Sequence, residues 1–570
     1  MLSKKYITFF ITVFLVFLDI NSWAQTIPPT LTAIGSQFYC PLEEINIVTD
    51  FSIIPGDEEI EAVFIQISEN YIEIEDMLLL TNQSSHPNIT IFWSASEGKL
   101  TLTSLIPSPT AYLNLIAAVK DVVFKSSVPN PTKDKTFSIT IDEKNYLPKT
   151  QHYYEYISAP GITWTEARDA AAALPPYYGV LDPYLATIIY AEEAQLCGEQ
   201  ATGQGWIGGS DAAIEGTWKW VTGPEAGMIF WNGLVDGSSP SGVYSNWADG
   251  EPNDWPNDNI TKEENYAHIY ETGKWNDYPN SNSSIKGYIV EYGGMPGNPI
   301  LDLAKETKIY IPKITSTIAP APICGSGTRT LSATSNTSFV LWFDALGTNL
   351  SSGNTYTTPL ISTTTSYYAL ASTDGNCENG ERIKIDVIVN TIPTITDVSP
   401  PITICGAGTA TLTATASEGI INWYDSLGNL LDTGTSFTPA STVSSTTTYY
   451  VDATENGCTT LTRTPVVLNV QYTAEPTGIS TQDFCDVENA TLNELTITGT
   501  AILWYNSLVG VTPLNSTDFL VNNTIYYASQ TLNGCESPTR LAVEVHIFET
   551  PTPPSTITFL EKCDDLSVGT

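Results

Sequence analysis

The chain has 570 residues, more than the roughly 100–150 of a common single domain, so we expect four or five modules. Its formal net charge is −39, from 62 acidic and 23 basic residues. This excess of carboxylates argues against binding to nucleic acid or anionic lipid, which both need a basic surface, and favours divalent cations as small partners.

The first residues have the pattern of a signal peptide, which we assign to 1–24. Lys4 and Lys5 precede an apolar run, and the small residues Ser22 and Ala24 occupy the minus-three and minus-one positions of a signal-peptidase site. The run is shorter than the roughly 20 residues that span a bilayer as a helix, and no later apolar stretch is long enough. The pattern predicts cleavage after Ala24 and a chain that is secreted or held at the extracellular cell surface, not membrane-spanning within these residues.

Residues 25–149 are predicted to form a β-sandwich. Short segments rich in β-branched and aromatic residues occur at 89–93, 99–103 and 136–141, which is typical of strands. The region resembles the cadherin-like or Ig-like sandwiches of large bacterial adhesins, without the calcium motifs of true cadherins.

Residues 150–294 have a different, mixed character. Thr163 and Glu166 have capping-box spacing, and an alanine-rich stretch follows until the prolines at 175–176, which predicts one helix. A second short helix is expected at 191–197. The other short segments, the first of them a predicted strand, are 185–188, 206–209, 216–220, 263–270, 274–277 and 287–292.

The order of these segments resembles the C-type lectin domain across 150–294, and several motifs agree. The sequence Trp-Ile-Gly-Gly at 206–209 is similar to the family's core strand. Glu-Pro-Asn at 251–253 is similar to its sugar-specificity tripeptide, and Trp-Asn-Asp at 275–277 matches a second family motif, with Glu264-Asn265 between the two. The resemblance implies an α+β domain, hereafter the lectin-like module.

These residue types suit calcium for a reason that does not depend on the family. Calcium takes about six to eight hard oxygens, which carboxylates and amide carbonyls supply. A cis peptide before Pro252 would turn the chain back tightly, so that Glu251 and Asn253 aim both side chains at one ion. The predicted protein ligands are Glu251, Asn253, Glu264, Asn276 and Asp277. Coordination positions then stay open.

A sugar with two adjacent hydroxyls is expected to fill these open positions. Each hydroxyl would give a lone pair to the ion and its proton to a carboxylate, while an amide group donates a hydrogen bond back. The predicted sugar contacts are Glu251, Asn253, Glu264 and Asn276, with Trp255 placed to stack on a sugar face or to cap the loop. In the family, Glu-Pro-Asn accompanies sugars of the mannose and glucose type.

The family's second, structural calcium site uses an acidic pair four residues apart. Asp211 and Glu215 match this pair, and Asp254, Glu264 and Asn265 follow in the motif order. The resemblance implies that this ion would rigidify the loops.

The lectin-like module departs from the family in its cysteines. Tyr266 and Val290 stand where two of the usual disulfide cysteines would be, so the core must hold by packing alone. Large aromatic residues bury well, and we expect four tryptophans in this core: Trp206, Trp218, Trp220 and Trp275.

Three copies of one further domain follow the module. Cys324, Cys405, Cys485 and Cys563 recur at a spacing of about 80 residues, and after each of the first three come a tryptophan, a tyrosine pair and a second cysteine. The segments within a copy alternate as strands do, and the copies resemble the immunoglobulin-like (Ig-like) repeats of bacterial, Bacteroidetes-like, surface proteins. We assign 295–393 to a linker and repeat 1, 394–473 to repeat 2, 474–549 to repeat 3, and 550–570 to the start of a fourth, truncated repeat.

The two cysteines of each copy are expected to form a disulfide within the copy, because an exported chain is oxidised. The predicted bonds are Cys324–Cys377, Cys405–Cys458 and Cys485–Cys535. Cys40 and Cys197 fall in different modules and are interpreted as separate buried thiols.

The sequence thus predicts a multidomain, mainly β protein: an N-terminal β-sandwich, an α+β C-type lectin-like domain and tandem Ig-like β-sandwiches. Its expected function is that of an extracellular, calcium-dependent carbohydrate-binding adhesin without catalytic residues. Two alternatives stay open. The protein is then either a structural or protein-binding surface protein, or the targeting region of a larger secreted enzyme.

Overall fold

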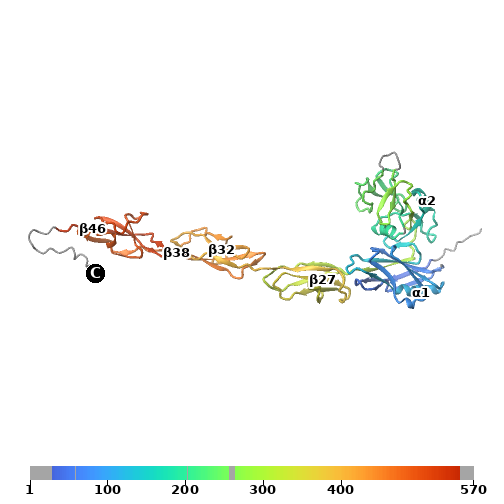
Figure 1. Ribbon diagram of the computed structural model, residues 1–570, viewed down its shortest axis with the longest axis horizontal. Coiled ribbons are helices and arrows are strands. Elements are labelled where there is room, and N and C mark those ends of the chain that lie inside the picture. Colours follow the sequence, from blue (N-terminus) through green and yellow to red (C-terminus); the bar gives the residue numbers. More distant parts are fainter. Residues whose placement is uncertain (1–27, 58, 202, 256–262, 552–570) are drawn as a thin grey trace, which may run out of the picture. The chain divides into compact units, whose positions relative to one another are not determined.

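The computed structural model describes residues 28–57, 59–201, 203–255 and 263–551 (Figure 1). The predicted signal peptide and nearly all of the fourth repeat lie outside these residues. The fold is mainly β, with several separate sheets, as predicted. It divides into two compact units: the first holds the N-terminal sandwich, the lectin-like module and most of repeat 1, and the second holds the rest of repeat 1 with repeats 2 and 3. In the described part of the chain, no helix is both long and apolar enough to cross a bilayer.

The N-terminal sandwich packs its strands and helix α1 (Thr110–Lys120) around one apolar core. Its largest sheet has the order β2-β20-β10-β5-β8-β7. Val63, Ile65 and Ile67 lie two residues apart in β5 and are fully buried, as the period of a strand requires. The strands are β1 (Thr30–Ile34), β2 (Ser36–Phe38), β3 (Ile45–Asn46), β4 (Asp50–Ile54), β5 (Ala62–Glu69), β6 (Asp76–Leu80), β7 (Ile89–Ser94), β8 (Lys99–Ser104), β9 (Val122–Ser126), β10 (Lys135–Thr140) and β20 (Ala304–Tyr310), with a 3-10 turn η1 (Gln83–Ser85).

Strand β20 belongs to this N-terminal sheet although it follows the lectin-like module in the chain. It pairs antiparallel with β10 and parallel with β2, whose Phe38 lies opposite Tyr310. The assignment of 304–310 to a linker is therefore corrected, because pairing with two distant strands makes this segment a sheet strand. The lectin-like module is inserted between two neighbouring strands of the sandwich.

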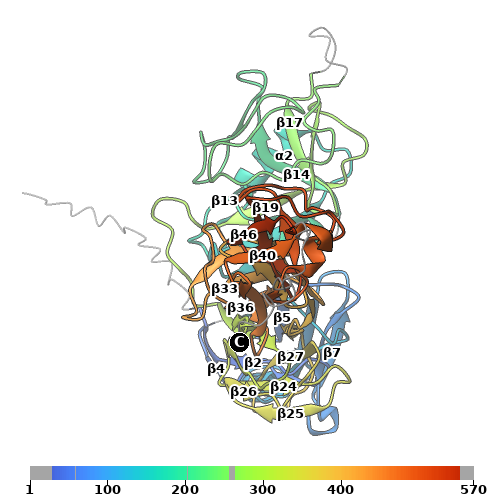
Figure 2. The ribbon, with the colours of Figure 1, turned by 90° about the vertical axis from the view of Figure 1, so that its left-hand side faces the viewer.

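The lectin-like module has one mixed sheet of nine strands with short helices beside it. Figure 2 shows β14, β17 and β19 of this sheet together with α2. The central order is β11-β12-β19-β14-β15-β16; β13 pairs with β19, and β17 joins β14 to β18. The elements are β11 (Asn145–Leu147), β12 (His152–Ser158), α2 (Trp164–Ala173), β13 (Pro183–Leu185), α3 (Ala191–Ala194), a π-helical turn η2 (Gln195–Glu199), β14 (Gly205–Ser210), β15 (Thr217–Trp220), β16 (Ile229–Asn232), β17 (Tyr266–Ile269), β18 (Trp275–Tyr278) and β19 (Gly287–Tyr292).

Both predicted helices of the module form. The Thr163 hydroxyl accepts a hydrogen bond from the Glu166 amide at 3.2 Å, and the Glu166 carboxylate accepts one from the Thr163 amide at 3.0 Å, so the capping box starts α2 as expected. The first and last long strands, β12 and β19, pair antiparallel. The two ends of the module are therefore neighbours, and this allows its insertion between β10 and β20.

The three Ig-like repeats are built from short strands. Repeat 1 has β21 (Ile314–Ile318), β22 (Ile323–Cys324), β23 (Thr330–Ser335), β24 (Phe339–Phe343), β25 (Asn349–Ser352), β26 (Thr355–Thr357), β27 (Thr365–Ser372), β28 (Arg382–Val387) and β29 (Val389–Asn390). Repeat 2 has β30 (Ile395–Val398), β31 (Ile402–Cys405), β32 (Leu412–Ala416), β33 (Ile420–Tyr424), β34 (Leu430–Thr433), β35 (Ser436–Phe437), β36 (Thr447–Glu455), β37 (Cys458–Thr459) and β38 (Thr464–Gln471). Repeat 3 has β39 (Thr477–Gly478), β40 (Thr481–Cys485), β41 (Ile497–Thr498), β42 (Leu503–Tyr505), β43 (Thr524–Ser529), β44 (Thr531–Leu532), β45 (Cys535–Glu536) and β46 (Leu541–Phe548), with 3-10 turns η3 (Asp486–Glu488) and η4 (Leu492–Glu494).

The repeated tryptophan is a core residue in each repeat. Trp423 is fully buried, stacks on Phe437 and donates its indole N–H to the Gly434 carbonyl at 2.9 Å. Trp342 makes the equivalent bond to the Gly353 carbonyl at 2.8 Å. Repeats 1 and 2 thus hold their core tryptophan by the same bond.

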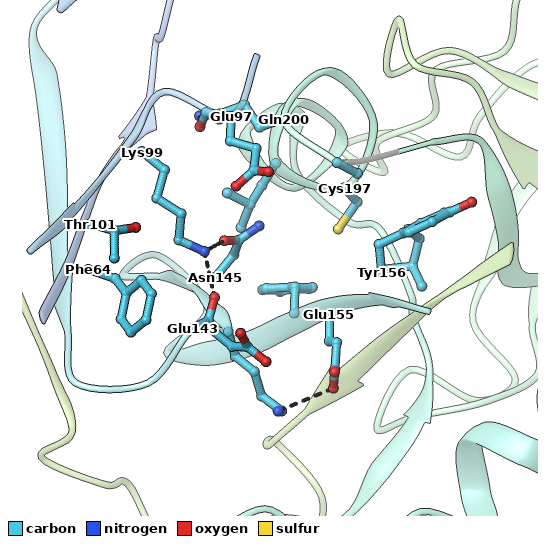
Figure 3. Close-up of a pocket in the computed structure, with 15 residues that line it drawn as sticks. Phe64, Glu97, Lys99, Thr101, Glu143, Asn145, Glu155, Tyr156, Cys197 and Gln200 are labelled. Carbon is cyan, nitrogen blue, oxygen red and sulfur yellow. Dashed lines mark hydrogen bonds and ion pairs between the residues drawn. The ribbon is translucent and has the colours of Figure 1, made fainter. Parts of the chain in front are cut away.

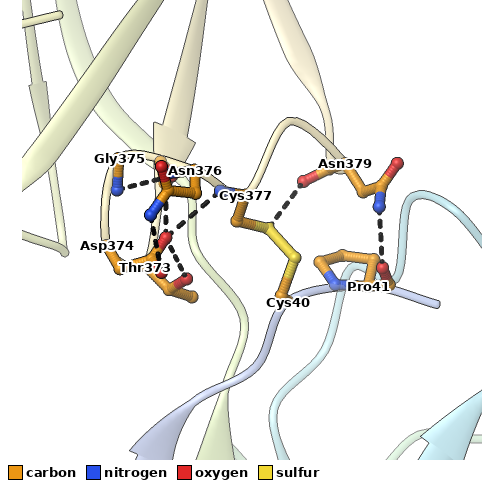
Figure 4. The surroundings of a disulfide bond; sticks show 9 residues. Cys40, Pro41, Thr373, Asp374, Gly375, Asn376, Cys377 and Asn379 are labelled. Carbon is orange, nitrogen blue, oxygen red and sulfur yellow. Dashed lines mark hydrogen bonds between the residues drawn. A yellow bond between two sulfur atoms is a disulfide. The ribbon is translucent and has the colours of Figure 1, made fainter. Parts of the chain in front are cut away.

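Within the described ranges the cysteines form three disulfides, and none of the three is a predicted pair. The bonds are Cys40–Cys377, Cys324–Cys458 and Cys405–Cys535 (Figure 4 shows the first). The first cysteine of a domain is bonded to the second cysteine of the next domain along the chain. Cys40 is therefore not a thiol, and of the two cysteines left over from the repeats only Cys197 is a buried thiol as predicted.

Strand direction explains why the predicted pairs do not form. In repeat 2, β31 runs parallel to the last strand, β38, so that Cys405 lies beside Gln471. Strand β36 runs antiparallel to β38 and carries the chain to Glu455, opposite Cys458. The two cysteines of the repeat are therefore separated by about 11 strand residues, or roughly 35 Å, whereas a disulfide needs Cα atoms within about 7 Å.

Candidate functional site

The predicted calcium ligands come from three segments of the lectin-like module. The loop after β16 supplies Glu251 and Asn253, the segment before β17 supplies Glu264, and β18 supplies Asn276 and Asp277. The peptide between Glu251 and Pro252 is cis, as the expectation for this loop required. Strand β18 pairs with β17 and brings the last two segments side by side.

Hydrogen bonds tie these segments together around Asp277. Its carboxylate, which is fully buried, accepts bonds from the backbone amides of Asn253 at 3.0 Å and Asp254 at 2.9 Å. Glu264 accepts one from the Trp255 amide at 3.0 Å and donates its own amide to Asp254 Oδ1 at 3.0 Å. The Glu-Pro-Asn loop, Glu264 and Asp277 therefore form one connected cluster.

The carboxylates of Glu264 and Asp277 are buried and that of Glu251 is half-buried, and the pKa values of all three rise. Burial and then the charge of Asp277 raise the pKa of Glu251 to about 7. Burial also raises the pKa of Glu264 to about 7, and the charges of Asp277 and Asp254 add to the effect. The pKa of Asp277 is raised by burial too, although the hydrogen bonds that its carboxylate accepts from two backbone amides oppose the shift. A bound cation would lower these pKa values again, because a nearby opposite charge favours the ionised form of a carboxylate.

Asp211 and Glu215, the predicted acidic pair of the second site, also lie together. The Asp211 side chain accepts the Gly216 amide at 2.9 Å, and its own amide donates to the Asn265 carbonyl at 3.3 Å. Burial, with the charge of Glu215 nearby, raises the pKa of Asp211 to about 8. The pKa of Glu215 is raised by burial and then by the charge of Asp254. This second acidic pair therefore borders the first cluster through Asp254.

Three oxygens of the two clusters are buried and accept no hydrogen bond from the described residues: Glu251 Oε2, Asn253 Oδ1 and Asp211 Oδ1. A carboxylate or amide oxygen can only accept, so each of them needs a donor or a cation. Among the described residues there is nevertheless no group of three or more His, Cys, Asp and Glu side chains arranged to hold a metal ion. The donor types fit calcium, and all three of these oxygens belong to predicted ligands; buried oxygens elsewhere in the described chain, among them Asp76 Oδ1 and Gln66 Oε1, also lack a partner.

The remaining predicted site residues, Asn276, Asn265 and Trp255, have other surroundings. Asn276 is buried, and its amide donates to the Asp277 carbonyl at 2.7 Å. The Asn265 amide donates to Glu263 at 3.3 Å. Trp255 is 72% exposed, so its indole lies open to solvent beside the loop. Part of that loop, 256–262, lies outside the described residues.

The expected aromatic core is confirmed. Trp206, Trp220 and Trp275 are fully buried and Trp218 is nearly so. Tyr266, which replaces a family cysteine, stacks on Trp164 with ring centroids 4.6 Å apart.

Sequence reasoning missed a second group of buried polar residues in the module. Glu291 accepts from the Thr187 amide at 3.0 Å and lies 2.6 Å from His152 Nδ1. Glu193 accepts the Tyr154 hydroxyl at 2.7 Å, and burial raises the pKa of Glu193 to about 8. An acid in the apolar strand 287–292 is the signal that points to this group, which joins β12 and β19 to α3 and to the segment before it.

A cavity of about 280 Å³ lies where the N-terminal sandwich meets the module (Figure 3). Lys99, Glu143 and Asn145 line one side, and Cys197 and Gln200 line the other. The Lys99 amine donates to the Glu143 carbonyl and the Asn145 side chain, and burial lowers the pKa of Lys99. None of the predicted calcium or sugar residues is among those that line this cavity, and its lysine already has partners within the described chain.

Comparisons with known proteins agree with this architecture. The family Ig-like domain CHU_C associated matches residues 312–390, 391–471 and 474–548. Halomucin of Haloquadratum walsbyi is 32% identical over 251 residues, which is 42% of this chain and 3% of halomucin. Human C-type lectin domain family 10 member A is 28% identical over 123 residues, which is 21% of this chain and 32% of that protein. The chain therefore spans under half the length of these relatives.

Among solved structures, the human scavenger receptor C-type lectin carbohydrate-recognition domain is 24% identical, with a TM-score of 0.19, covering 26% of this chain and 94% of that one. On the family match and the lectin relative, the chain carries a C-type lectin-like domain together with tandem Ig-like repeats of the CHU_C-associated type.

Proposed function

We propose that the lectin-like module binds calcium and, with it, a neutral hexose of the mannose or glucose type, and that the protein is an extracellular adhesin. The similarity to lectins supports carbohydrate binding in general. The observation that carries the proposal further is the set of buried oxygens without a hydrogen-bond donor among the described residues, on Glu251, Asn253 and Asp211.

The proposed ligands of the first ion are Glu251, Asn253, Glu264, Asn276 and Asp277, and those of a second ion are Asp211, Glu215, Asp254, Glu264 and Asn265. Calcium, when bound, would supply open coordination positions for two sugar hydroxyls. The side chains would bind the same hydroxyls by hydrogen bonds. The carboxylates of Glu251 and Glu264 accept hydrogen bonds from the hydroxyl groups, and the side-chain amides of Asn253 and Asn276 donate hydrogen bonds to the hydroxyl oxygens. Because these carboxylates leave the site anionic, neutral sugars should bind better than acidic ones.

Trp255 is proposed to supply an apolar surface for the sugar. Its indole is mostly exposed although large aromatic side chains usually bury, and the buried tryptophans of the module are not available for this role. We expect Trp255→Ala to weaken sugar binding without changing the affinity for calcium.

Isothermal titration of calcium into the full chain, followed by mannose-resin binding with and without EGTA, tests the proposal. Glu251→Gln with Asn253→Asp should weaken calcium binding or shift the sugar preference towards galactose. Glu271→Gln, an exposed acid of the same module, is the matched control and should change neither. Calcium binding without any sugar would support the alternative, a protein-binding scaffold. No calcium binding would overturn the proposed site.

The same proposal places the protein outside the cell and assigns the described residues a binding role, not a catalytic one. Disulfides persist mainly in oxidising compartments, and three are present here. Mass mapping of the three bonds in protein purified from its native source would test this location.

A further inference from the structure

The disulfides follow one rule along the chain. In the N-terminal sandwich and in each repeat, a strand next to the first cysteine runs parallel to the last strand of that domain: β2 beside β20, β22 beside β29, β31 beside β38 and β40 beside β46. The first cysteine is thereby carried to the end where the chain leaves the domain. In three cases the bond then reaches the second cysteine of the following domain.

The contacts around the bonds repeat as well. Asn390 donates its side-chain amide to the Asn456 carbonyl at 3.1 Å, and Cys324 Sγ lies 4.0 Å from the Gly457 carbonyl oxygen. Further along, Gln471 donates to the Leu532 carbonyl, and Cys405 Sγ lies 3.9 Å from the Gly534 carbonyl oxygen.

The turns that present Cys458 and Cys535, the second cysteines of two of the bonds, are Asn-Gly turns. Asn456 and Gly457, and likewise Asn533 and Gly534, have positive φ angles, which this turn type requires. At the first bond, Asn379 donates to the Pro41 carbonyl at 3.1 Å (Figure 4). Two of the three connections are therefore built alike, and the first has a side-chain hydrogen bond of its own across the two domains.

We propose that these bonds make the chain a length-limited mechanical tether, in which tension passes from domain to domain through disulfides and bypasses most of the folded chain. This is a function in addition to sugar binding, and it holds whether or not the module binds a sugar. The proposal depends on which cysteines are joined, because the order of the bonds sets the shortest covalent path between two points of the chain.

That path is short. Cys40 and Cys377 are 337 residues apart in sequence, and Cys405 and Cys535 are 130 apart. Between residues 28 and 551, tension then follows only the segments 28–40, 377–405 and 535–551, about 56 residues or roughly 190–200 Å when extended. The same stretch without disulfides would extend to roughly 1,700–1,900 Å. The lectin-like module lies in the loop closed by Cys40–Cys377 and is bypassed.

Tension that enters through the module takes another path. From Asp249, an exposed residue of the module, the shortest route runs to Cys324, crosses to Cys458, returns to Cys405 and crosses to Cys535. For this route the bond Cys324–Cys458 matters and the bond Cys40–Cys377 does not. Cys40–Cys377 therefore shortens the path between the two ends of the chain, and Cys324–Cys458 shortens the path from the module to the C-terminal end. Cys405–Cys535 lies on both paths.

Single-molecule force spectroscopy of the full chain, with handles at its two ends, tests the tether. All proteins carry Cys485→Ser and Cys563→Ser, so that no bond of these cysteines enters the path. Relative to this background, Cys40→Ser with Cys377→Ser should add about 309 residues to the fully extended length, roughly 1,000–1,100 Å. Cys405→Ser with Cys535→Ser should add about 102 residues, roughly 340–370 Å.

The matched control is Cys324→Ser with Cys458→Ser, which should leave the end-to-end length unchanged. When the N-terminal handle is moved to Asp249 and the C-terminal handle stays in place, the expectations reverse. This control pair should then add about 28 residues to the fully extended length, roughly 90–100 Å, and the pair Cys40→Ser with Cys377→Ser should add nothing. Covalent connections alone set these lengths, so a variant that loses its fold still reports them.

Disulfides within single repeats would instead make the Cys324→Ser, Cys458→Ser pair lengthen the chain when it is pulled from its ends. That result, or a background protein that extends as far as its reduced form, would overturn the proposal. Loss of calcium or sugar binding would leave these lengths unchanged, so failure of the proposed lectin function is distinguishable.

Discussion

The pKa values of acidic residues shift in opposite directions in the lectin-like module and in the Ig-like repeats. In the module, Glu264 and Asp211 are buried and Glu251 is half-buried, with other acids nearby, and their pKa values rise. In the repeats, Asp344 and Asp425 lie at the surface of turns and accept backbone amides, which lower their pKa values. The repeats use carboxylates to stabilise turns, whereas the module holds carboxylates whose charged form is penalised by burial.

The two regions also differ in what holds them together. The only cysteine in the described part of the module is Cys197, a buried thiol, and its core is a cluster of aromatic rings around Trp220 and Trp275. The repeats have smaller cores and are joined to one another by disulfides. One chain therefore contains a module stabilised by packing and repeats that are joined to one another by covalent bonds.

Removal of an aromatic ring from the module should have the largest effect on stability. Trp220 stacks on Phe230 at 4.3 Å and is fully buried, so Trp220→Ala should cost about 3–5 kcal/mol in the free energy of unfolding of the module. Segment-resolved hydrogen exchange of the full chain measures this. Trp255→Ala, at an exposed position, is the control and should change stability by less than about 0.5 kcal/mol. If both variants lost the same free energy of unfolding, the module would not be stabilised mainly by its aromatic core.

Loss of the disulfide between repeats 2 and 3 should act on these repeats more than on the module. Cys405→Ser with Cys535→Ser should destabilise repeats 2 and 3 by about 2–4 kcal/mol, because a closed loop restricts the unfolded chain. Calorimetry and segment-resolved exchange should show little change in the module. An equal loss of protection in the module would remove the contrast between the two regions.

The pH dependence of stability should have opposite signs in the two regions. Without calcium, Glu251, Glu264 and Asp211 bind protons more tightly in the folded module than in the unfolded chain. Their contribution is present below the unfolded pKa of about 4–4.5 and is lost as pH rises through about 7–8. Asp344 and Asp425 have lowered pKa values, so their contribution to the repeats is lost as pH falls below the unfolded value.

Thermal unfolding in EDTA at pH 5 and pH 8 measures this contrast. The module should melt at a lower temperature at pH 8, and added calcium should stabilise it at pH 8 more than at pH 5, because the metal needs ionised carboxylates. Glu251→Gln should flatten the dependence. A module equally stable at both pH values in EDTA would contradict the burial of these charges.

The smallest expected effect is at the capping box of α2. Thr163→Ala removes the acceptor of the Glu166 amide and should cost about 1 kcal/mol, while Thr163→Ser should keep the bond. Chemical denaturation followed by tryptophan fluorescence measures both variants. A loss as large as that of Trp220→Ala would mean that the helix start, and not the aromatic core, holds the module.

Much of the molecule was predictable because its signals are local. The capping box at Thr163 predicted α2, the alternation of β-branched residues predicted the strands, and the repeated tryptophan predicted the core of each repeat. The Glu-Pro-Asn and Trp-Asn-Asp motifs predicted side chains that the structure joins through Asp277. Each of these follows from the residue types in a short window.

Long-range strand order could not be read in the same way. Spacing alone made Cys324–Cys377 the natural pair, and only the parallel pairing of β22 with β29 places Cys324 at the end of the repeat that meets Cys458. Only the pairing of β20 with β10 and β2 shows that the module is an insertion. The sequence by itself determined which elements form and which residues could bind an ion, because propensity and pattern act locally. The tertiary structure decided which cysteines and which strands meet, because that depends on the direction in which distant strands run.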